Sequence, residues 1–323
     1  MKKFCIKIVI FLLPFILVTL FFEIYLRGIN TNYKEKMAGL QAKNKSIELL
    51  VLGNSHANYG IDPTKFDLET YNMAMVNQPL YHDYKITEKV IDSLKNLKAV
   101  VICIDYHTLY FSDQGLRNNW IYYDYDIDTN VKFINKFSRF WNGYTPKVSF
   151  SMLKYDVKRR IFSYKNKIPT LNYHVEEGVV ITDTIKNGWL GYTGSNSKKF
   201  THQAALNRAN TFNKLVEDEE EKRNNLLLLN SFLDLLNKRG IKSFVITMPS
   251  SSVFNANVRE DVRKKDILLV KETLKKHNVN YYDFFHSLKE EEYYYDSDHL
   301  NKKGAHLFSS ILNDSINKNL KMN

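Results

Sequence analysis

The chain has 323 residues, which is enough for one large domain or two small ones. Hydrophobic residues make up 44% and charged residues 25%, values that exclude a disordered, collagen-like or multi-span membrane chain. The net charge is +11, but the sequence contains no zinc-finger spacing, RNP-like motif or arginine-rich arm, so we expect no nucleic-acid partner. The only cysteines, Cys5 and Cys103, exclude a disulfide scaffold and a cysteine zinc cage.

The chain opens with an apolar segment. Residues 4–26 are apolar apart from Lys7, Thr19 and Glu23, and about 20 such residues suffice to cross a lipid bilayer. The basic start also fits a cleaved signal peptide, but no A-x-A-like cleavage site follows and the run is long for such a peptide. We therefore predict an uncleaved single-pass membrane anchor in residues 1–29.

Basic residues lie on both sides of this segment and do not decide its orientation: Lys2, Lys3 and Lys7 precede or begin it, and Arg27, Lys34 and Lys36 follow it. The very short leader and the function inferred below lead us to predict that the N-terminus stays inside. The C-terminal domain would then be extracytoplasmic, held at the cell membrane.

After a polar linker over residues 30–46, strand and helix signals alternate. Short apolar runs predict five strands, at Ile47–Leu52, Tyr71–Val76, Ala99–Ile104, Phe244–Met248 and Val279–Phe285. Apolar residues at helical spacing predict helices within residues 83–98, 226–236, 267–274 and 307–316. This alternation predicts a three-layer α/β/α fold around a five-stranded, mainly parallel, flavodoxin-like sheet.

Residues 110–203 interrupt the alternation. They show little periodicity but many aromatic side chains, among them Trp120, Trp141, Trp189 and Tyr192. We predict a large insertion there, within a single domain that spans residues 47–323.

A serine follows the first predicted strand, in Gly53-Asn54-Ser55-His56. Its hydroxyl would project from the sheet edge, and its amide would join the free amides at a helix N-terminus. Ser55 could therefore attack a carbonyl and also help to hold the resulting oxyanion. The alternative is an ordinary serine at the start of a helix.

The segment Asp296-Ser297-Asp298-His299 precedes the last predicted helix. Asp296 could accept the Nδ1 proton of His299, which would leave Nε2 free to take a proton from a serine hydroxyl. A metal site made of Asp296, Asp298 and His299 is the alternative, but no further cluster of ligands completes it, so we expect no metal. The serine and this segment are far apart in the sequence, yet they would be neighbours at the edge of a doubly wound sheet.

These two motifs carry a resemblance. Leu50-Val51-Leu52-Gly53-Asn54-Ser55-His56 resembles the first block of the SGNH (GDSL-like) hydrolase superfamily, and Asp296 to Asn301 with Gly304 is similar to its last block. The resemblance implies that Ser55 is the nucleophile, His299 the base and Asp296 its orienting partner, with no cofactor.

The sequence departs from the superfamily where the oxyanion hole is usually completed. The superfamily has a glycine after the second strand and Gly-x-Asn after the third, whereas this chain has Met75-Val76-Asn77-Gln78 and Ile104-Asp105-Tyr106-His107. Asn77 could donate its side-chain amide instead, beside the amide of Ser55. The remaining candidates for the pocket lie in the same turns: Asn54, His56, Gln78, Tyr106 and His107.

In lacking the usual asparagine, the chain resembles membrane-tethered members of the superfamily that act on cell-surface polymers. These include alginate O-acetyltransferase-like and teichoic-acid D-alanylation proteins. We therefore expect an esterase or O-acyltransferase acting on acyl esters, acetyl above all, of a cell-surface polysaccharide. A transferase would also need a membrane partner that donates the acyl group. The altered oxyanion positions motivate the alternative of a catalytically inactive protein that binds polysaccharide during envelope glycan assembly or export.

Overall fold

The chain forms two compact units, one from Met1–Glu35 and Gly115–Thr184 and the other from Lys36–Gln114 and Ile185–Asn323. The structure, a computed structural model, describes residues 2–28, 31–112, 118–128, 153–154, 156–158, 160–161, 164–165, 174–176, 179–181, 185–192 and 200–321. Every residue predicted for the site lies in the second unit. Much of the predicted insertion, Trp141 included, lies outside the described residues.

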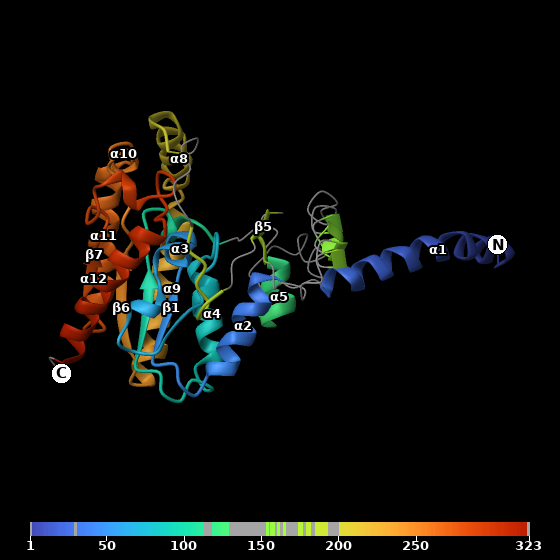
Figure 1. Cartoon of the computed structure of the whole chain (residues 1–323), viewed down its shortest axis with the longest axis horizontal. Helices are drawn as coiled ribbons and strands as arrows, with labels where there is room; N and C mark the ends of the chain where they lie inside the picture. Colours follow the sequence, from blue (N-terminus) through green and yellow to red (C-terminus); the bar gives the residue numbers. More distant parts are fainter. Residues whose placement is uncertain are drawn as a thin grey trace. The chain divides into compact units, whose positions relative to one another are not determined.

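The first unit contains the apolar N-terminal segment as helix α1 (Lys2–Arg27). An 18-residue window of this helix has a mean hydropathy of 2.7, and none of the window is buried, so the helix is long and apolar enough to cross a membrane (Figure 1). A single-pass anchor and a signal sequence both have these properties. The same unit contains α5 (Asn118–Tyr125) and the antiparallel pair β4 (His174–Glu176) and β5 (Val179–Ile181).

Helix α2 (Asn32–Lys43) occupies most of the segment expected to be a polar linker. Its buried residues Tyr33, Met37 and Leu40 recur four and three positions apart, which is the spacing of one helical face. The segment is polar overall, and this short stripe of three residues is the signal that distinguishes it from a linker.

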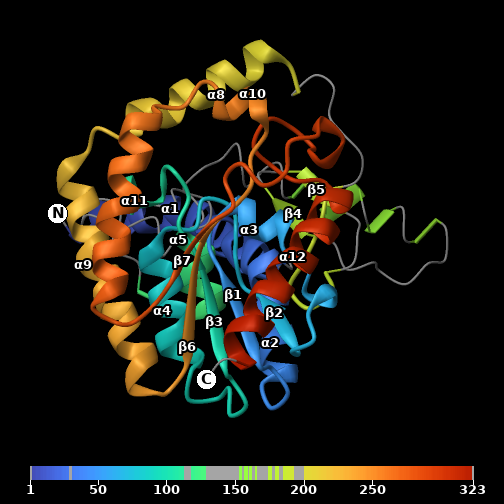
Figure 2. The same cartoon turned by 90° about the vertical axis from the view of Figure 1, so that its left-hand side faces the viewer.

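The second unit is built on a five-stranded sheet in which all strands are parallel. Its order is β2 (Thr70–Asn72), β1 (Leu49–Leu52), β3 (Ala99–Cys103), β6 (Lys242–Thr247) and β7 (Tyr281–Asp283) (Figure 2). This confirms the predicted fold class, because the order matches that of flavodoxin-like sheets. Strand β2 is shorter than predicted, although Met73 N and Met75 N still donate to Val51 O and Gly53 O beyond its end.

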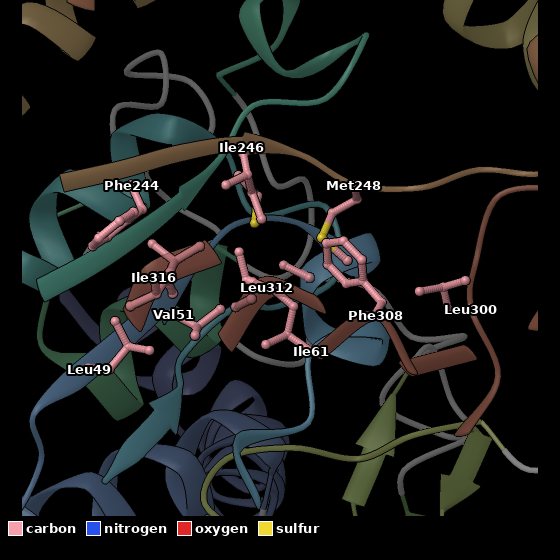
Figure 3. Close-up of a cluster of buried hydrophobic side chains, with 14 of the residues drawn as sticks. Leu49, Val51, Ile61, Phe244, Ile246, Met248, Leu300, Phe308, Leu312 and Ile316 are labelled. Atoms are coloured by element: carbon pink, nitrogen blue, oxygen red, sulfur yellow. The ribbon is translucent and has the colours of Figure 1, made fainter. Parts of the chain in front are cut away.

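Helices cover both faces of the sheet. Alternate strand residues such as Val51 and Ile246 point toward α12 (Lys302–Lys321), which contributes Phe308, Leu312 and Ile316 at helical spacing (Figure 3). Helices α4 (Leu80–Val90), α9 (Glu219–Lys238) and α11 (Glu260–Lys275) lie on the other side (Figure 2). The remaining elements of this unit are short or peripheral: α3 (Ser55–Gly60), η1 (Pro63–Lys65), η2 (Thr108–Tyr110), α8 (His202–Leu215), α10 (Ser252–Asn255) and η6 (Glu291–Tyr293).

Residues 185–192 lie along β2, the strand at one edge of the sheet, and are held there by hydrogen bonds. The Asn72 amide donates to Asn187 O at 2.9 Å, and the Trp189 indole Nε1 donates to Tyr59 O at 2.9 Å. Lys186 and Trp189 pair with each other as an antiparallel bridge. The end of the predicted insertion is therefore part of the sheet-bearing unit.

The turn after β1 requires a glycine. Gly53 has φ +140°, and a Cβ at this position would lie 2.7 Å from Cys103 Cβ and 3.2 Å from Ala57 Cβ. Backbone conformation and packing therefore both exclude larger residues here. The turn directs the chain from the sheet edge into α3, and Ser55 is the first residue of that helix.

We predict that Gly53→Ala lowers the free energy of unfolding by about 2–5 kcal/mol, because strained backbone and overpacking act together. Gly240→Ala is the matched control, since Gly240 also has positive φ (+66°) but a Cβ added there would have nothing within 4 Å. It should cost only the backbone penalty of about 1–2 kcal/mol. Equal losses in urea unfolding of the two variants would show that packing at Gly53 is not restrictive.

Candidate active site

Ser55 lies at the carboxyl end of β1, where the sheet order reverses between β1 and β3. Asn54 caps helix α3 by accepting a hydrogen bond from His56 N at 2.9 Å, which fixes the backbone around the serine. Ser55 itself is 5% exposed. Crevices at such reversal points are the usual ligand sites of open parallel sheets.

The structure brings Ser55, His299 and Asp296 together. Ser55 Oγ lies 2.9 Å from His299 Nε2, and His299 Nδ1 lies 2.9 and 3.1 Å from the two carboxylate oxygens of Asp296. A carboxylate can only accept, so His299 Nδ1 carries the proton and Nε2 is left as an acceptor for the serine hydroxyl. This is the arrangement that general-base activation of a hydroxyl requires.

The loop that carries Asp296 and His299 is held by its own hydrogen bonds. Asp296 Oδ1 also accepts from His299 N at 2.9 Å. Asn301 Nδ2 donates to Glu292 O at 2.8 Å, and its Oδ1 accepts from Gly304 N at 3.0 Å at the start of α12. The imidazole and its carboxylate are therefore fixed before any ligand binds.

A buried network of charged groups lies next to these three residues. The two ring nitrogens of His56 face Asp105 Oδ2 at 2.9 Å and Asp298 Oδ2 at 3.1 Å. Arg208 Nε donates to the same Asp298 oxygen at 2.8 Å, and Asn54 Nδ2 donates to Asp105 Oδ2 at 2.9 Å. His56 therefore belongs to this network and lies next to the predicted catalytic residues.

The charges in this network stabilise one another. Burial alone would lower the pKa of the His56 imidazole, but Asp105 and Asp298 outweigh it and raise that pKa to about 10. Burial alone would raise the pKa of the Asp298 carboxyl, but His299, Arg208 and His56 bring it well below its usual value. The pKa of Asp105 is lowered in the same way by His56. We infer that His56 is a cation and that both aspartates are anions at neutral pH.

Ligand atoms of His56, Asp298 and His299 lie within 4.8 Å of one another, a spacing that a metal ion could use. However, Arg208 Nε and His56 Nε2 both contact the Asp298 oxygen, and His299 Nδ1 is engaged by Asp296. A cation would have to displace these groups. We therefore interpret the cluster as a hydrogen-bonded ion network.

Two other pocket candidates, Asn54 and His107, line the same turns. Asn54 Nδ2 faces His107 Nε2 at 3.4 Å, and the His107 ring stacks on Phe212 with ring centroids 4.0 Å apart. Burial lowers the pKa of His107 to about 3, so this ring is neutral. Both side chains are buried and engaged by neighbours.

Tyr106 and Gln78 point elsewhere. Tyr106 donates its hydroxyl proton to Asn213 Oδ1 at 2.9 Å, and its side chain lines a cavity whose lining includes Arg263 and Asp266 but neither Ser55 nor His299. Gln78 is completely buried and donates to Met73 O and Asp83 Oδ1.

Asn77 lies in the exposed turn after β2, with φ +51°. Two residues earlier, Met75 N donates to Gly53 O, so this turn leaves the strand beside the turn that carries Ser55. Asparagine tolerates positive φ better than most residues. Its role as an oxyanion donor stays a prediction.

Three tyrosines stack beside His299. The rings of Tyr59 and Tyr192 are 3.9 Å apart, as are those of Tyr192 and Tyr295. Tyr59 and Tyr192 meet the His299 ring edge to face, at centroid distances of 5.6 and 6.1 Å. The insertion therefore contributes an aromatic side chain, Tyr192, to the surroundings of the predicted base.

Arg208 is not predicted from the sequence, and neither are the roles of Asp105 and Asp298 in the network. Arg208 lies on α8, beyond the end of the aperiodic insertion, and nothing in the local sequence indicates its partner. Asp105 and Asp298 were visible as polar residues at the carboxyl end of a strand and before the last helix. That position was the available signal.

Comparison with known proteins adds little to this geometry. A protein-family model that carries no functional description matches residues 195–321. No curated protein matches the chain. Among solved structures, the chain is similar to a "putative acylhydrolase" from Bacteroides fragilis, with 12% identity and a TM-score of 0.42 over 90% of this chain and 99% of that one. The assignment to the α/β class rests on the sheet order and the helix layers described above.

The turn that carries Ser55 is also hydrogen-bonded to a buried carboxyl group. Asp83 Oδ1 accepts from Gly53 N at 3.0 Å and from Gln78 Nε2 at 2.7 Å. Burial raises the pKa of Asp83 to about 8, although both hydrogen bonds act to lower it. The carboxyl is therefore largely neutral at pH 7.

We predict that Asp83→Asn becomes more stable relative to the wild type as pH rises. The neutral carboxyl of Asp83 contributes stability below its ordinary pKa of 3.8, and this contribution is lost as pH rises through about 8. Between these values the difference in unfolding free energy should change by at most about 1.4 kcal/mol per pH unit. Urea unfolding at several pH values measures this. A difference that does not depend on pH would contradict a buried neutral Asp83.

Proposed function

We propose that this protein is an SGNH-like serine esterase or O-acyltransferase, anchored in the cell membrane, that acts on acyl esters of a cell-surface polysaccharide. The observation that carries the proposal is the Ser55 Oγ to His299 Nε2 contact of 2.9 Å, with Asp296 on the other ring nitrogen. The first and last motifs of the sequence, which resemble those of that superfamily, supply these same residues.

The reaction proceeds through an acyl-enzyme. Ser55 Oγ attacks the acyl carbonyl carbon while His299 Nε2 takes the hydroxyl proton, and His299 then gives that proton to the departing sugar oxygen. Water or a sugar hydroxyl next attacks the acyl-enzyme, with its proton passing through His299. Asp296 keeps the imidazole in the required tautomer and stabilises its charged form.

The oxyanion of the tetrahedral intermediate would be held by the backbone amide of Ser55 and by the side chain of Asn77. Within the described residues the Ser55 N–H has no hydrogen-bond acceptor, and the Asn77 side chain makes no hydrogen bond either. Both donors are thus available for the negative charge that develops on the substrate.

The substrate class and the location are supported by other features. Helix α1 can anchor the chain, and the orientation proposed here places the second unit outside the cytoplasm, where envelope polysaccharides lie. Tyr192 and Tyr295 are partly exposed and present aromatic surface near His299, with the buried Tyr59 stacked on Tyr192; such a surface suits packing against a sugar ring. Transfer from a donor on the other side of the membrane would need a membrane partner to deliver the acyl group.

We predict that a fluorophosphonate probe labels Ser55 of the full-length protein in detergent micelles. Ser55→Ala should abolish labelling, because the attacking oxygen is gone. Asp296→Asn should slow it by about 10³- to 10⁴-fold, because the amide favours the wrong imidazole tautomer. Asp314→Asn, an exposed aspartate on α12, is the control and should label normally.

Folded protein that retains affinity for envelope polysaccharide but never reacts with the probe would contradict the enzyme. That result would instead favour the polysaccharide-binding protein. Release of acetate from an acetylated polysaccharide, measured with and without an added acceptor glycan, distinguishes hydrolysis from transfer.

We predict that Asn77→Ala lowers the turnover number by about 10²- to 10³-fold, because one oxyanion donor is lost. Asn278→Ala is the matched control, since Asn278 also has positive φ (+56°) but lies after α11, away from Ser55 in the sequence and the sheet. Full turnover by the Asn77→Ala variant would dismiss this donor without affecting the proposed nucleophile.

A further inference from the structure

His56 is enclosed by carboxylates on both sides of its ring. Its Nδ1 lies 2.9 Å from Asp105 Oδ2 and its Nε2 lies 3.1 Å from Asp298 Oδ2, and its side chain is only 6% exposed. A neutral imidazole has one N–H donor, whereas an ionised carboxylate can only accept. Two such hydrogen bonds therefore require either a doubly protonated ring or a protonated carboxyl group.

Other donors favour ionised carboxylates. Asp105 also accepts from Asn54 Nδ2 and from Met248 N, each at 2.9 Å. Asp298 also accepts from Arg208 Nε at 2.8 Å. Hydrogen bonds of this kind stabilise the anion, so the proton resides on His56, in agreement with the raised pKa of this imidazole.

The position of this ring joins three parts of the site. His56 directly follows Ser55, Asp105 follows strand β3, and Asp298 lies between Asp296 and His299 in the loop before α12. One imidazole therefore connects the nucleophile turn with the loop that carries the predicted base.

We propose that His56 is a positioning residue: as a buried imidazolium it fixes the loop of Asp296 and His299 against Ser55 and neutralises Asp298 beside the base. The inference rests on the proposed function for its kinetic consequences. The bridge and its charge can be observed without catalysis.

The neutralisation matters because His299 has two carboxylates near Nδ1. Asp296 lies at 2.9 Å and Asp298 Oδ1 at 3.6 Å. Among the described residues, the other groups that face His299 are Ser55, the tyrosine pair Tyr59 and Tyr192, and the ring of His56, whose centroid is 5.0 Å away. Without the His56 cation, Arg208 would be the charged partner left on Asp298, so the surroundings of the proposed base would become more negative.

The test is the pH dependence of fluorophosphonate labelling in the full-length protein. His56→Gln removes the cation, so the acidic limb of the rate profile should move to higher pH, and misplacement of the loop should slow labelling roughly 10- to 100-fold at pH 7. Asp298→Asn removes the carboxylate charge and keeps an acceptor for Arg208. It should move the same limb to lower pH.

His277→Gln is the control for loss of a buried histidine, since His277 has a 7% exposed side chain and faces Asp234 rather than the site. It should leave the labelling profile unchanged. Slower labelling by the same factor at every pH in both the His56 and the Asp298 variant would indicate structural support only, and would overturn the proposal. Shifts of the limb in the same direction in both variants would also overturn it.

A second readout does not depend on activity. In ¹⁵N-histidine spectra of the Ser55→Ala protein, both ring nitrogens of His56 should carry protons from pH 6 to pH 8. When His56→Gln is added to this protein, the chemical shift of the His299 Nδ1 proton should change, because a charged neighbour of its ring is removed. A neutral His56 at pH 7, or an unchanged His299 proton signal, would overturn the proposal even if Ser55 labels. A charged His56 in a protein that never labels would refute the proposed function and leave the bridge in place.

Discussion

One hydrogen bond, between Ser55 Oγ and His299 Nε2, joins the first and last parts of the sheet-bearing unit. It can form only because parallel strands place their carboxyl ends at one edge of the sheet and because the order reverses between β1 and β3. Gly53 then directs the chain so that the serine leads into α3, and the packing of Cys103 and Ala57 leaves no room for a larger residue there. The geometry of the candidate site thus depends on the strand order first and on this turn second.

The ion network beside Ser55 and His299 places several charged side chains in the protein interior. Asp105, His56 and Asp298 are each at most 5% exposed, and removing charges from water is costly even when they are paired. Apolar side chains of similar volume would often stabilise a protein as much or more. A cluster of this kind, directly behind a candidate nucleophile, is where a fold is expected to give up stability in exchange for a defined arrangement of polar groups.

Much of the architecture follows from local sequence patterns. The apolar strands Leu49–Leu52 and Ala99–Cys103 could be predicted because strands buried on both faces are continuously apolar, and the DSDH segment holds the predicted base and its carboxylate within one loop. Helix α2 was not predicted because its buried stripe has only three residues in a polar segment. The contact between Arg208 and Asp298 could not be predicted, because it joins residues 90 positions apart and no periodic pattern encodes which side chains meet across a sheet edge. The same holds for the role of His56, whose two carboxylate partners come from different loops.

Residues 185–192 lie along strand β2 and cover part of this outer edge of the sheet. An outer strand with open N–H and C=O groups is a template on which other chains can add by backbone pairing. The hydrogen bond from Asn72 to Asn187 uses one of these groups, and the Trp189 indole holds the covering segment in place. We expect that a shortened protein without residues 185–192 would expose this edge of β2 and associate more readily through backbone pairing.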